Sequence, residues 1–425
     1  MAEPTVLTPV RRRRFFYGYV VVAAGIVTSV FLIGVVTSFG IFFKPLSTEF
    51  GWTRAMTSVA TSIGALMMGL SALLMGRLTD RYGPRVVFIA SGLLIALGNL
   101  LLARVTTLWQ LYLYQGVLVG AAMGAADIPM LATVARWFVK KRGIMTGIAK
   151  VGAGIGIMVI PLLSSWLISS YGWRNAYVII GIIAASGIIA AALFFKRDPG
   201  QIGELPDGAV RTQEVESHIA AHEFSLREAL ASRQFWIFAT VWFTFMFCVQ
   251  VVMVHIANHV TDLGISAAIA AGVLSAIGGF SILGRLGLAG ISDVIGPKAS
   301  FVIGFFLLAG AFLWVQIAQV SWMLYVFAAI YGMAHGASLA LFSPMTARLF
   351  GLKSLGSILG VIVFVGTFGG IISPILAGRI FDITGSYSIV FWICFTLSVV
   401  GLTMLFALRP AVHKAEGNLP SPDNS

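Results

Sequence analysis

Arg285 lies inside an apolar stretch, residues 267–291, that contains no other charged residue. A guanidinium keeps its proton in any protein environment, so burying one in lipid is costly unless an anion compensates it. No carboxylate lies three or four residues from Arg285, so that anion must come from another helix or from a ligand. A guanidinium can bind a carboxylate through two parallel hydrogen bonds, and we therefore interpret Arg285 as a candidate site for an anionic substrate. Structural pairing with a carboxylate on a neighbouring helix is the alternative.

Two further charged residues fall inside apolar stretches. Lys150 lies about two helical turns into the stretch 143–168. Its side chain could reach the membrane surface along its aliphatic stem, or it could provide a second cation for the substrate. Asp127, in the stretch 109–134, is the one acidic residue placed clearly inside a predicted span. It could pair with Lys150, pair with Arg285, or carry a proton.

Histidine side chains are the other candidates. His255 lies near the middle of the stretch 235–261, close to Asn258, and could donate a hydrogen bond to a substrate or take up a proton. His335, in the stretch 322–346, is a comparable substrate contact, with helix packing as the alternative. The spacing of His255, His259 and Asp262 is also compatible with a metal site on one helix, but such spacing is a weak indicator. We expect no metal site and no cofactor.

The composition indicates a membrane protein. Of the 425 residues, 58% are hydrophobic and 10% are charged, as in polytopic helical membrane proteins. The net charge of +12 would suggest a nucleic-acid partner in a soluble protein. Here the charges lie in the short connections between apolar stretches, so membrane topology explains them and no nucleic acid is expected. The two cysteines, Cys248 and Cys394, both fall within apolar stretches, which argues against a disulfide framework.

The apolar stretches predict an all-α fold of about twelve transmembrane helices, because each is near the ~20 residues that cross a bilayer. Their approximate limits are 17–43, 55–76, 85–105, 109–134, 143–168, 175–195, 235–261, 267–291, 299–319, 322–346, 354–380 and 386–408. The predicted parts are a cytosolic N-terminus (1–16), a six-helix bundle (17–195), a polar cytosolic linker (196–234), a second six-helix bundle (235–408) and a cytosolic tail (409–425).

Basic residues predict the orientation in the membrane. With the N-terminus inside, 21 of the 28 Lys and Arg residues fall in cytosolic segments and five in outer segments. This bias favours cytosolic termini, in agreement with an even number of spans. The absence of an N-x-S/T sequon agrees with a bacterial inner membrane. We also expect the protein to be a monomer.

The two halves of the chain repeat each other. The segment Asp80–Arg85 recurs as Asp293–Lys298 at an offset of 213 residues, and Pro161 and Gly172 recur as Pro374 and Gly385 at the same offset. A parallel duplication of a six-helix unit explains these matches. Such repeats place a substrate site near the bilayer midplane, between the halves.

The loop after the second stretch resembles the signature loop of the major facilitator superfamily. It reads Gly76-Arg-Leu-Thr-Asp80-Arg81-Tyr-Gly83-Pro-Arg85, and Asp293, Gly296 and Lys298 are its counterparts in the second half. Twelve spans and two parallel halves agree, so the resemblance covers nearly the whole chain. It implies that these loops latch the two halves on the cytosolic side through a charge relay.

Narrower features resemble the monocarboxylate transporter and oxalate–formate antiporter branch of that superfamily. They are Ile41–Leu46, Trp137–Gly143 followed by Gly147–Gly152, Tyr171–Arg174, and Val254–Gly264. Arg285 falls where the branch carries its carboxylate-binding arginine. Thr37 and Ser281 stand where animal members have a lysine and an aspartate implicated in proton coupling. The coupling route of those members therefore cannot be transferred to this chain.

These features together predict a secondary transporter that is not an enzyme. The expected substrate is a small monocarboxylate such as lactate or pyruvate, bound by Arg285 and moved by alternating access in the lipid bilayer. A proton is the expected partner ion, with Asp127 and His255 as candidate carriers. The alternative is an exchanger of oxalate- or formate-like anions, or a carrier of another organic anion, that uses Lys150 as a second cation. A transporter-like sensor is a further alternative, whereas no motif supports an intramembrane enzyme.

Overall fold

The computed structural model describes residues 16–126, 128–138, 142–204, 206, 224–351 and 354–408. The N-terminal segment, most of the linker between the halves and the C-terminal tail therefore lie outside the described residues. Within the described ranges the regular structure is entirely helical. The long helices of the first half are α1 (Gly18–Phe50), α2 (Arg54–Tyr82), α3 (Pro84–Leu102) and α7 (Arg142–Ala192). Those of the second half are α9 (Arg233–Asp262), α10 (Ala267–Ile295), α11 (Pro297–Val315), α12 (Ser321–Phe350), α13 (Leu355–Thr384) and α14 (Ser388–Ala407).

The described helices cross the molecule twelve times, although ten of them are long and apolar enough individually to span a membrane. The difference has two causes. Gly172 has φ 79° and ψ 158°, so it breaks α7 into two helical stretches that cross in opposite directions. The fourth crossing is divided into α4 (Leu108–Leu111), a π-helical turn η1 (Tyr112–Val119), α5 (Gly120–Met123) and α6 (Ile128–Trp137), each too short to span alone. The prediction of an all-α, twelve-helix protein is confirmed.

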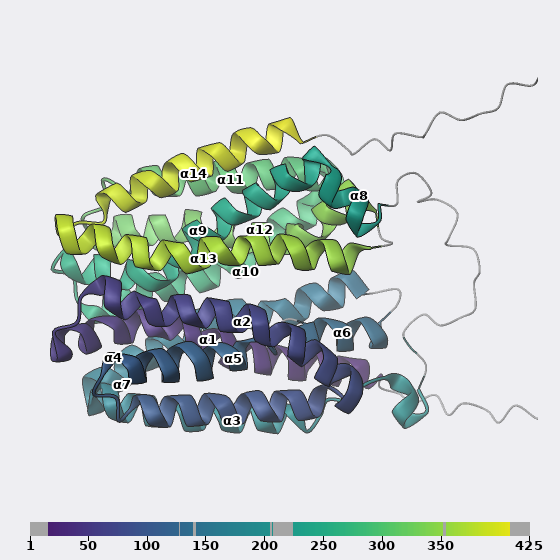
Figure 1. The fold of residues 1–425 in the computed structure, drawn as a ribbon, viewed down its shortest axis with the longest axis horizontal. Helices are drawn as coiled ribbons and strands as arrows, with labels where there is room; N and C mark the ends of the chain where they lie inside the picture. The colour runs from purple at the N-terminus through teal and green to yellow at the C-terminus, as the bar shows by residue number, and fades with distance from the viewer. Residues whose placement is uncertain are drawn as a thin grey trace, which may run out of the picture.

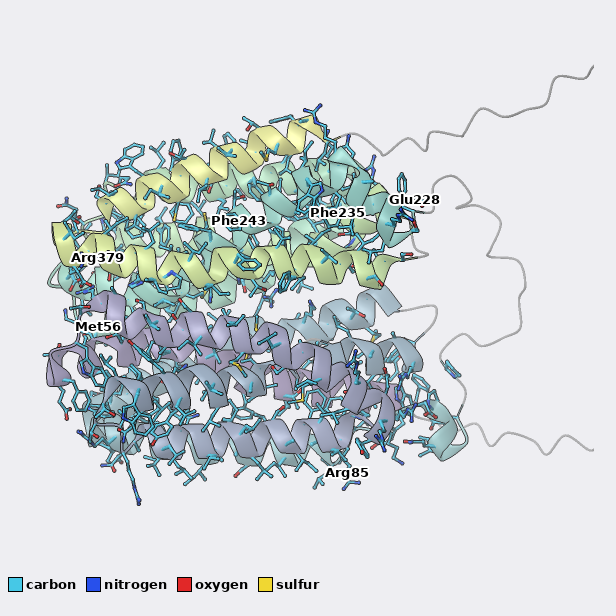
Figure 2. The ribbon with its side chains drawn as sticks, viewed as in Figure 1. Met56, Arg85, Glu228, Phe235, Phe243 and Arg379 are labelled. Atoms are coloured by element: carbon cyan, nitrogen blue, oxygen red, sulfur yellow. The ribbon has the colours of Figure 1, made fainter. Side chains whose placement is uncertain are left out.

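The helices form two bundles that lie side by side, one from each half of the chain (Figure 1). Helices α1–α7 make the first bundle, α9–α14 make the second, and the short helix α8 (Leu226–Ala231) precedes the second. Figure 2 shows Met56 and Arg379 at the end of the molecule opposite Arg85 and Glu228. We call the end that holds the start of α1 and the last turn of α14 the termini end, and the opposite end the far end.

The sequence repeat is also a repeat of backbone conformation. Gly83 and Gly296 follow α2 and α10 with nearly the same backbone angles, φ 85° and ψ 164° against φ 86° and ψ 154°. A side chain is strained at such positive φ, which explains glycine at both turns. Each glycine is followed by a proline in the first turn of the next helix, where the missing N–H costs nothing.

The two bundles meet chiefly through three helix pairs: α2 with α13, α7 with α10, and α1 with α9. The contact of α2 with α13 extends from the far end, where Gly378 meets Ala55, to the middle of both helices, where Gly69 meets Thr367. The contact of α7 with α10 extends from Ser165 near the far end to Lys150. The halves therefore touch from the far end to beyond the middle of the molecule.

Candidate functional site

Arg285 is buried at the contact between the two halves. Its side chain comes from α10, and the residue is 8% exposed. Nη1 donates a hydrogen bond of 2.7 Å to the backbone carbonyl of Lys150, which belongs to α7 in the other half. Ten residues separate Arg285 from the end of α10, which places it ~15 Å from the termini end of that helix. The guanidinium is thus held deep in the interface between the halves.

Small residues bring α7 and α10 close enough for this contact. A Cβ atom added at Gly278 would lie 2.5 Å from the backbone nitrogen of Met158 and 2.8 Å from the carbonyl oxygen of Gly154. The Ser275 hydroxyl donates to the Met158 carbonyl across the same contact. Arg285 lies two turns along α10 from Gly278, and Lys150 one turn along α7 from Gly154. Backbone contact at the glycines therefore delivers the guanidinium to the opposite helix.

The structure brings Lys150 and Arg285 together across the halves. The Lys150 side chain is half-buried, and its backbone carbonyl accepts the hydrogen bond from Arg285. Two cationic residues therefore approach one another from opposite bundles. Asp127, the predicted partner or proton carrier, lies outside the described residues.

His335 is buried in the second bundle. It is 4% exposed, and its ring lies parallel to that of Tyr331, with centroids 6.0 Å apart. It also stacks on Phe245, with centroids 6.2 Å apart. Neither His335 Nδ1 nor the Tyr331 hydroxyl has a hydrogen-bond partner among the described residues. His335 is thus packed against aromatic rings of α9 and α12, and its predicted role in substrate binding stays a prediction.

The three other polar residues considered from the sequence bond to their own helices. The Asn258 amide donates to the Val254 carbonyl at 3.1 Å, and Asn258 is 1% exposed. The Thr37 hydroxyl donates to the carbonyls of Ile33 and Gly34. The Ser281 hydroxyl donates to the carbonyl of Gly278 at 2.8 Å. Intrahelical bonds of this kind satisfy buried hydroxyl and amide groups without a ligand.

His255 lies away from Arg285, near the far end. Seven residues separate it from the end of α9, which corresponds to ~10 Å, whereas Arg285 lies ~27 Å from the far end of α10. The imidazole is fully buried and contacts the Tyr387 hydroxyl, the Pro374 carbonyl and the Ser58 hydroxyl. These partners come from both halves. The structure therefore places His255 away from Arg285, although both were predicted from the sequence to contact the substrate.

The two signature loops lie at the termini end, and each binds within its own half. The Asp80 carboxylate accepts a hydrogen bond of 2.6 Å from Nη2 of Arg136, on α6. Gly76 and Arg81 lie in the last turns of α2, and the Arg81 guanidinium lies over the ring of Tyr82. Arg85 is exposed at the start of α3, two residues after Gly83. In the second half, Nζ of Lys298 donates to the carbonyls of Phe406 and Leu408 at the end of α14. The side chain of Asp293 lies outside the described residues, and the role of both loops as a latch between halves stays a prediction.

The far end holds charged residues that sequence reasoning did not select. Arg54 at the start of α2 contacts Asp262 at the end of α9 and Tyr387 before α14, and Asp382 of α13 binds the start of α2. Each of these residues lies at a helix end, where charged side chains are ordinary in a membrane protein. One signal in the sequence could have indicated their contact. Arg54 is basic, Asp262 and Asp382 are acidic, and all three lie at helix ends that the predicted topology places on the same side of the membrane.

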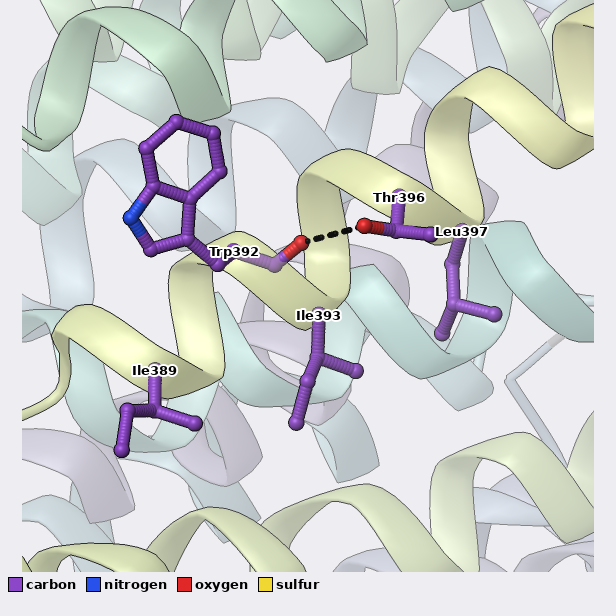
Figure 3. Close-up of a pocket in the computed structure, with 5 residues that line it drawn as sticks. All are labelled: Ile389, Trp392, Ile393, Thr396 and Leu397. Atoms are coloured by element: carbon purple, nitrogen blue, oxygen red, sulfur yellow. Dashed lines mark hydrogen bonds between the residues drawn. The ribbon is translucent and has the colours of Figure 1, made fainter.

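Surface crevices on the apolar exterior do not coincide with these polar groups. The crevice in Figure 3 runs along α14 and is lined by Ile389, Trp392, Ile393, Thr396 and Leu397. The Thr396 hydroxyl is bonded to the carbonyl of Trp392, on its own helix. No charged side chain lines it, so it offers nothing that would recognise an anion. Its lining matches what lipid chains would contact on a transmembrane helix.

Comparison with known proteins agrees with this architecture. Residues 22–298 and 281–423 match the family model of the Major Facilitator Superfamily. The chain is 29% identical over 395 residues to monocarboxylate transporter 13 of Rattus norvegicus, covering 92% of this chain and 89% of the relative. It is 30% identical over 348 residues to the uncharacterized MFS-type transporter YhjX of Escherichia coli K12, covering 80% and 82%.

A solved structure shares the fold. It is a bacterial homologue of the human lysosomal transporter Spinster in an inward-facing, unoccupied conformation, with a TM-score of 0.67 at 15% identity, covering 93% of this chain and 94% of that one. The chain therefore belongs to the major facilitator superfamily, a class of multi-pass membrane transporters, and within it resembles the monocarboxylate transporter branch.

Proposed function

We propose that this protein is a secondary transporter of small monocarboxylates of the lactate and pyruvate type, and not an enzyme. The observation that carries the proposal is the buried guanidinium of Arg285, bonded to Lys150 of the opposite half. A carboxylate entering between the bundles can accept two parallel hydrogen bonds from one edge of the guanidinium. The relatives named monocarboxylate transporters support the same substrate class.

The transport cycle follows from the two-bundle architecture. In transporters built from repeats, the halves rock about a site at their interface, which faces each side of the membrane in turn. Positive-inside topology assigns the termini end to the cytosol of a bacterial cell and the far end to the outside. The contact between the halves, which extends from the far end to beyond the middle, then corresponds to a carrier that is closed on the outside. A proton carried with the monoanion would make each cycle electroneutral.

Substitution of Arg285 tests the binding role. We expect Arg285→Lys to keep the positive charge but lose the bidentate hydrogen bonding to a carboxylate, and Arg285→Gln to lose both. A hydrogen bond to a charged group contributes ~1.5–3 kcal/mol, so apparent affinity for labelled lactate in proteoliposomes should fall about tenfold to a hundredfold. Arg379→Gln is the matched control, because Arg379 is exposed at the far end of α13. Uptake by both Arg285 variants equal to that of the control would refute the carboxylate-binding role.

The approach of Lys150 to Arg285 supports one alternative, an exchanger or carrier of another organic anion that uses both cations. A dianion such as oxalate gains from a second cation, whereas a monoanion has one carboxylate to place. Competition of unlabelled oxalate, formate and acetate against labelled lactate, with and without a pH gradient, separates the two functions. Oxalate competing best, without dependence on the gradient, would favour the alternative.

A further inference from the structure

The far end of the interface is closed by a network of charges from both halves. Arg54 binds Asp262 through two contacts, Nη1 to Oδ2 at 2.7 Å and Nη2 to Oδ1 at 2.8 Å. Lys44 adds a third cation–carboxylate contact to Asp262, at 3.2 Å. The Asp382 carboxylate accepts hydrogen bonds of 2.9 Å from the backbone N–H groups of Arg54 and Ala55. Both cations come from the first half and both carboxylates from the second, so every one of these bonds must break when the halves part.

His255 lies beneath this network, and its partners define its tautomer. Nε2 is 3.0 Å from the Pro374 carbonyl, which can accept a hydrogen bond but cannot donate one. Nε2 therefore carries the hydrogen. The Ser58 hydroxyl, 3.3 Å from Nε2, donates its own hydrogen to the Arg54 carbonyl and can accept as well. In the neutral imidazole, Nδ1 is then left as an acceptor.

Tyr387 connects Nδ1 of His255 to Arg54 of the charged network. Its hydroxyl is 3.0 Å from His255 Nδ1 and accepts a hydrogen bond of 2.6 Å from Nη1 of Arg54. Burial raises the pKa of Tyr387, so the phenol keeps its proton and donates it to Nδ1. The bonds run in one direction, from Arg54 through Tyr387 to His255 and on to Pro374. This chain joins α2 of the first half to α9 and α13 of the second.

A second proton on His255 conflicts with that arrangement. Nδ1–H would face the Tyr387 oxygen, which already accepts from Arg54, and the tyrosine hydrogen would lose its acceptor. The other charged or titratable groups around this site are Arg54 from α2, Lys44 from α1, Asp262 and His259 from α9, and Asp382 from α13. The two carboxylates are already bound to Arg54, Lys44 and the start of α2. A buried imidazolium next to Arg54 therefore adds repulsion and breaks one link of the chain.

We propose that the far-end network is a gate controlled by the protonation of His255. It closes this end of the interface while His255 is neutral and opens when His255 takes up a proton. Water reaches the imidazole when the halves part, so its charged form is solvated in the open state alone. The assignment of this end to the outside rests on the proposed function, and on that assignment an external proton opens the carrier to external substrate. The proton must leave His255 before this end closes again.

The gate can be tested without any substrate. Ser62→Cys is the reporter, because Ser62 is 3% exposed and its hydroxyl bonds to the Ile371 carbonyl of the other half, beneath the network. The rate of labelling by an impermeant maleimide added to the far side is measured between pH 8 and pH 5. Dividing it by the rate for the exposed Ser170→Cys corrects for thiol ionisation. The two native cysteines are fully buried, so the parent chain provides the background.

We expect the corrected rate to rise as the pH falls, by up to about tenfold per pH unit for a one-proton linkage. His255→Gln keeps a neutral donor and acceptor and should make the rate low and independent of pH. Tyr387→Phe removes the link to Arg54 and the conflict between Nδ1–H and the phenol, so the rise with falling pH should become smaller, which keeps the test decisive if His255→Gln fails to fold. His259→Gln, one turn away, should retain it. A pH response that persists in His255→Gln, that keeps its full size in Tyr387→Phe, or that is absent in the parent overturns the gate and leaves the role of Arg285 untouched.

Discussion

Arg54→Gln should shift the far end towards its open state, and the structure allows the size of the shift to be estimated. The substitution removes the two contacts to Asp262 and the hydrogen bond to Tyr387. It also removes the stacking of the guanidinium on the ring of Phe381, whose centroid is 3.6 Å away. The bonds from Asp382 to the start of α2 remain, because they involve backbone N–H groups.

The magnitude follows from the exposure of the partners. The Arg54 side chain is 14% exposed and that of Asp262 is 23% exposed, so solvent partly screens the pair. We take about 1 kcal/mol for such an ion pair and up to about 1 kcal/mol for the stacking on Phe381. A total of about 2 kcal/mol corresponds to a roughly thirtyfold change in the ratio of open to closed molecules.

The assay is the labelling of Ser62→Cys from the far side, at a pH where His255 is neutral. Arg174→Gln is the matched control: Arg174 binds Glu49 at 2.7 Å and stacks on Trp173 at 4.2 Å, at the same end but within one half. We expect Arg54→Gln to label faster and Arg174→Gln to label at the parent rate. Asp262→Asn alone should also raise the labelling rate. The rate increase in the double variant should be smaller than the product of the two single increases, because both substitutions remove the same contact between Arg54 and Asp262. A rate for Arg54→Gln within about twofold of that for Arg174→Gln would refute the assignment of these charges to the gate.

Two more predictions concern the contact between α7 and α10. Gly278→Leu should abolish uptake and lower the thermal stability in detergent, because its Cβ would lie 2.5 Å from the backbone nitrogen of Met158. Gly310→Leu is the control, because nothing lies within 4 Å of a Cβ at that position. Equal behaviour of the two variants would contradict the packing argument. Lys150→Met leaves the carbonyl that Arg285 binds, so affinity for lactate should change less than about twofold, while inhibition by oxalate should weaken about tenfold if a second cation binds it. Equal losses for lactate and oxalate would place the Lys150 side chain in monoanion binding instead.

The membrane-spanning helices could be predicted from the sequence because their cause is local. Each stretch must satisfy its own backbone in lipid, so a run of apolar residues is sufficient to indicate a helix. The fourth crossing shows the limit of that reasoning. Residues 109–134 read as one span, yet the structure divides them into α4, η1, α5 and α6. Hydropathy does not report such interruptions, since apolar side chains are present on both sides of each break.

The candidate site was only partly predictable. Arg285 was selected because a charge in an apolar stretch is costly wherever that stretch packs. Its approach to Lys150 depends on the close packing of Gly154 and Gly278, which join positions 124 residues apart in the chain. The association of His255 with Asn258 came from adjacency in the sequence. The structure instead bonds His255 to Tyr387 and Pro374, which are 132 and 119 residues away.

The sequence by itself determined the class of the protein: twelve apolar helices, two repeated halves, the positive-inside charge bias and one arginine that lipid would not tolerate alone. These properties depend on the composition of single segments, and a bilayer acts on each segment separately. The tertiary structure alone decided which polar groups meet. Arg54, Asp262, Asp382 and Tyr387 lie at the ends of separate helices and form a network only when the two bundles close against each other. Hydrogen bonds act over about 3 Å, so their partners are set by how helices pack and cannot be read from the order of residues along the chain.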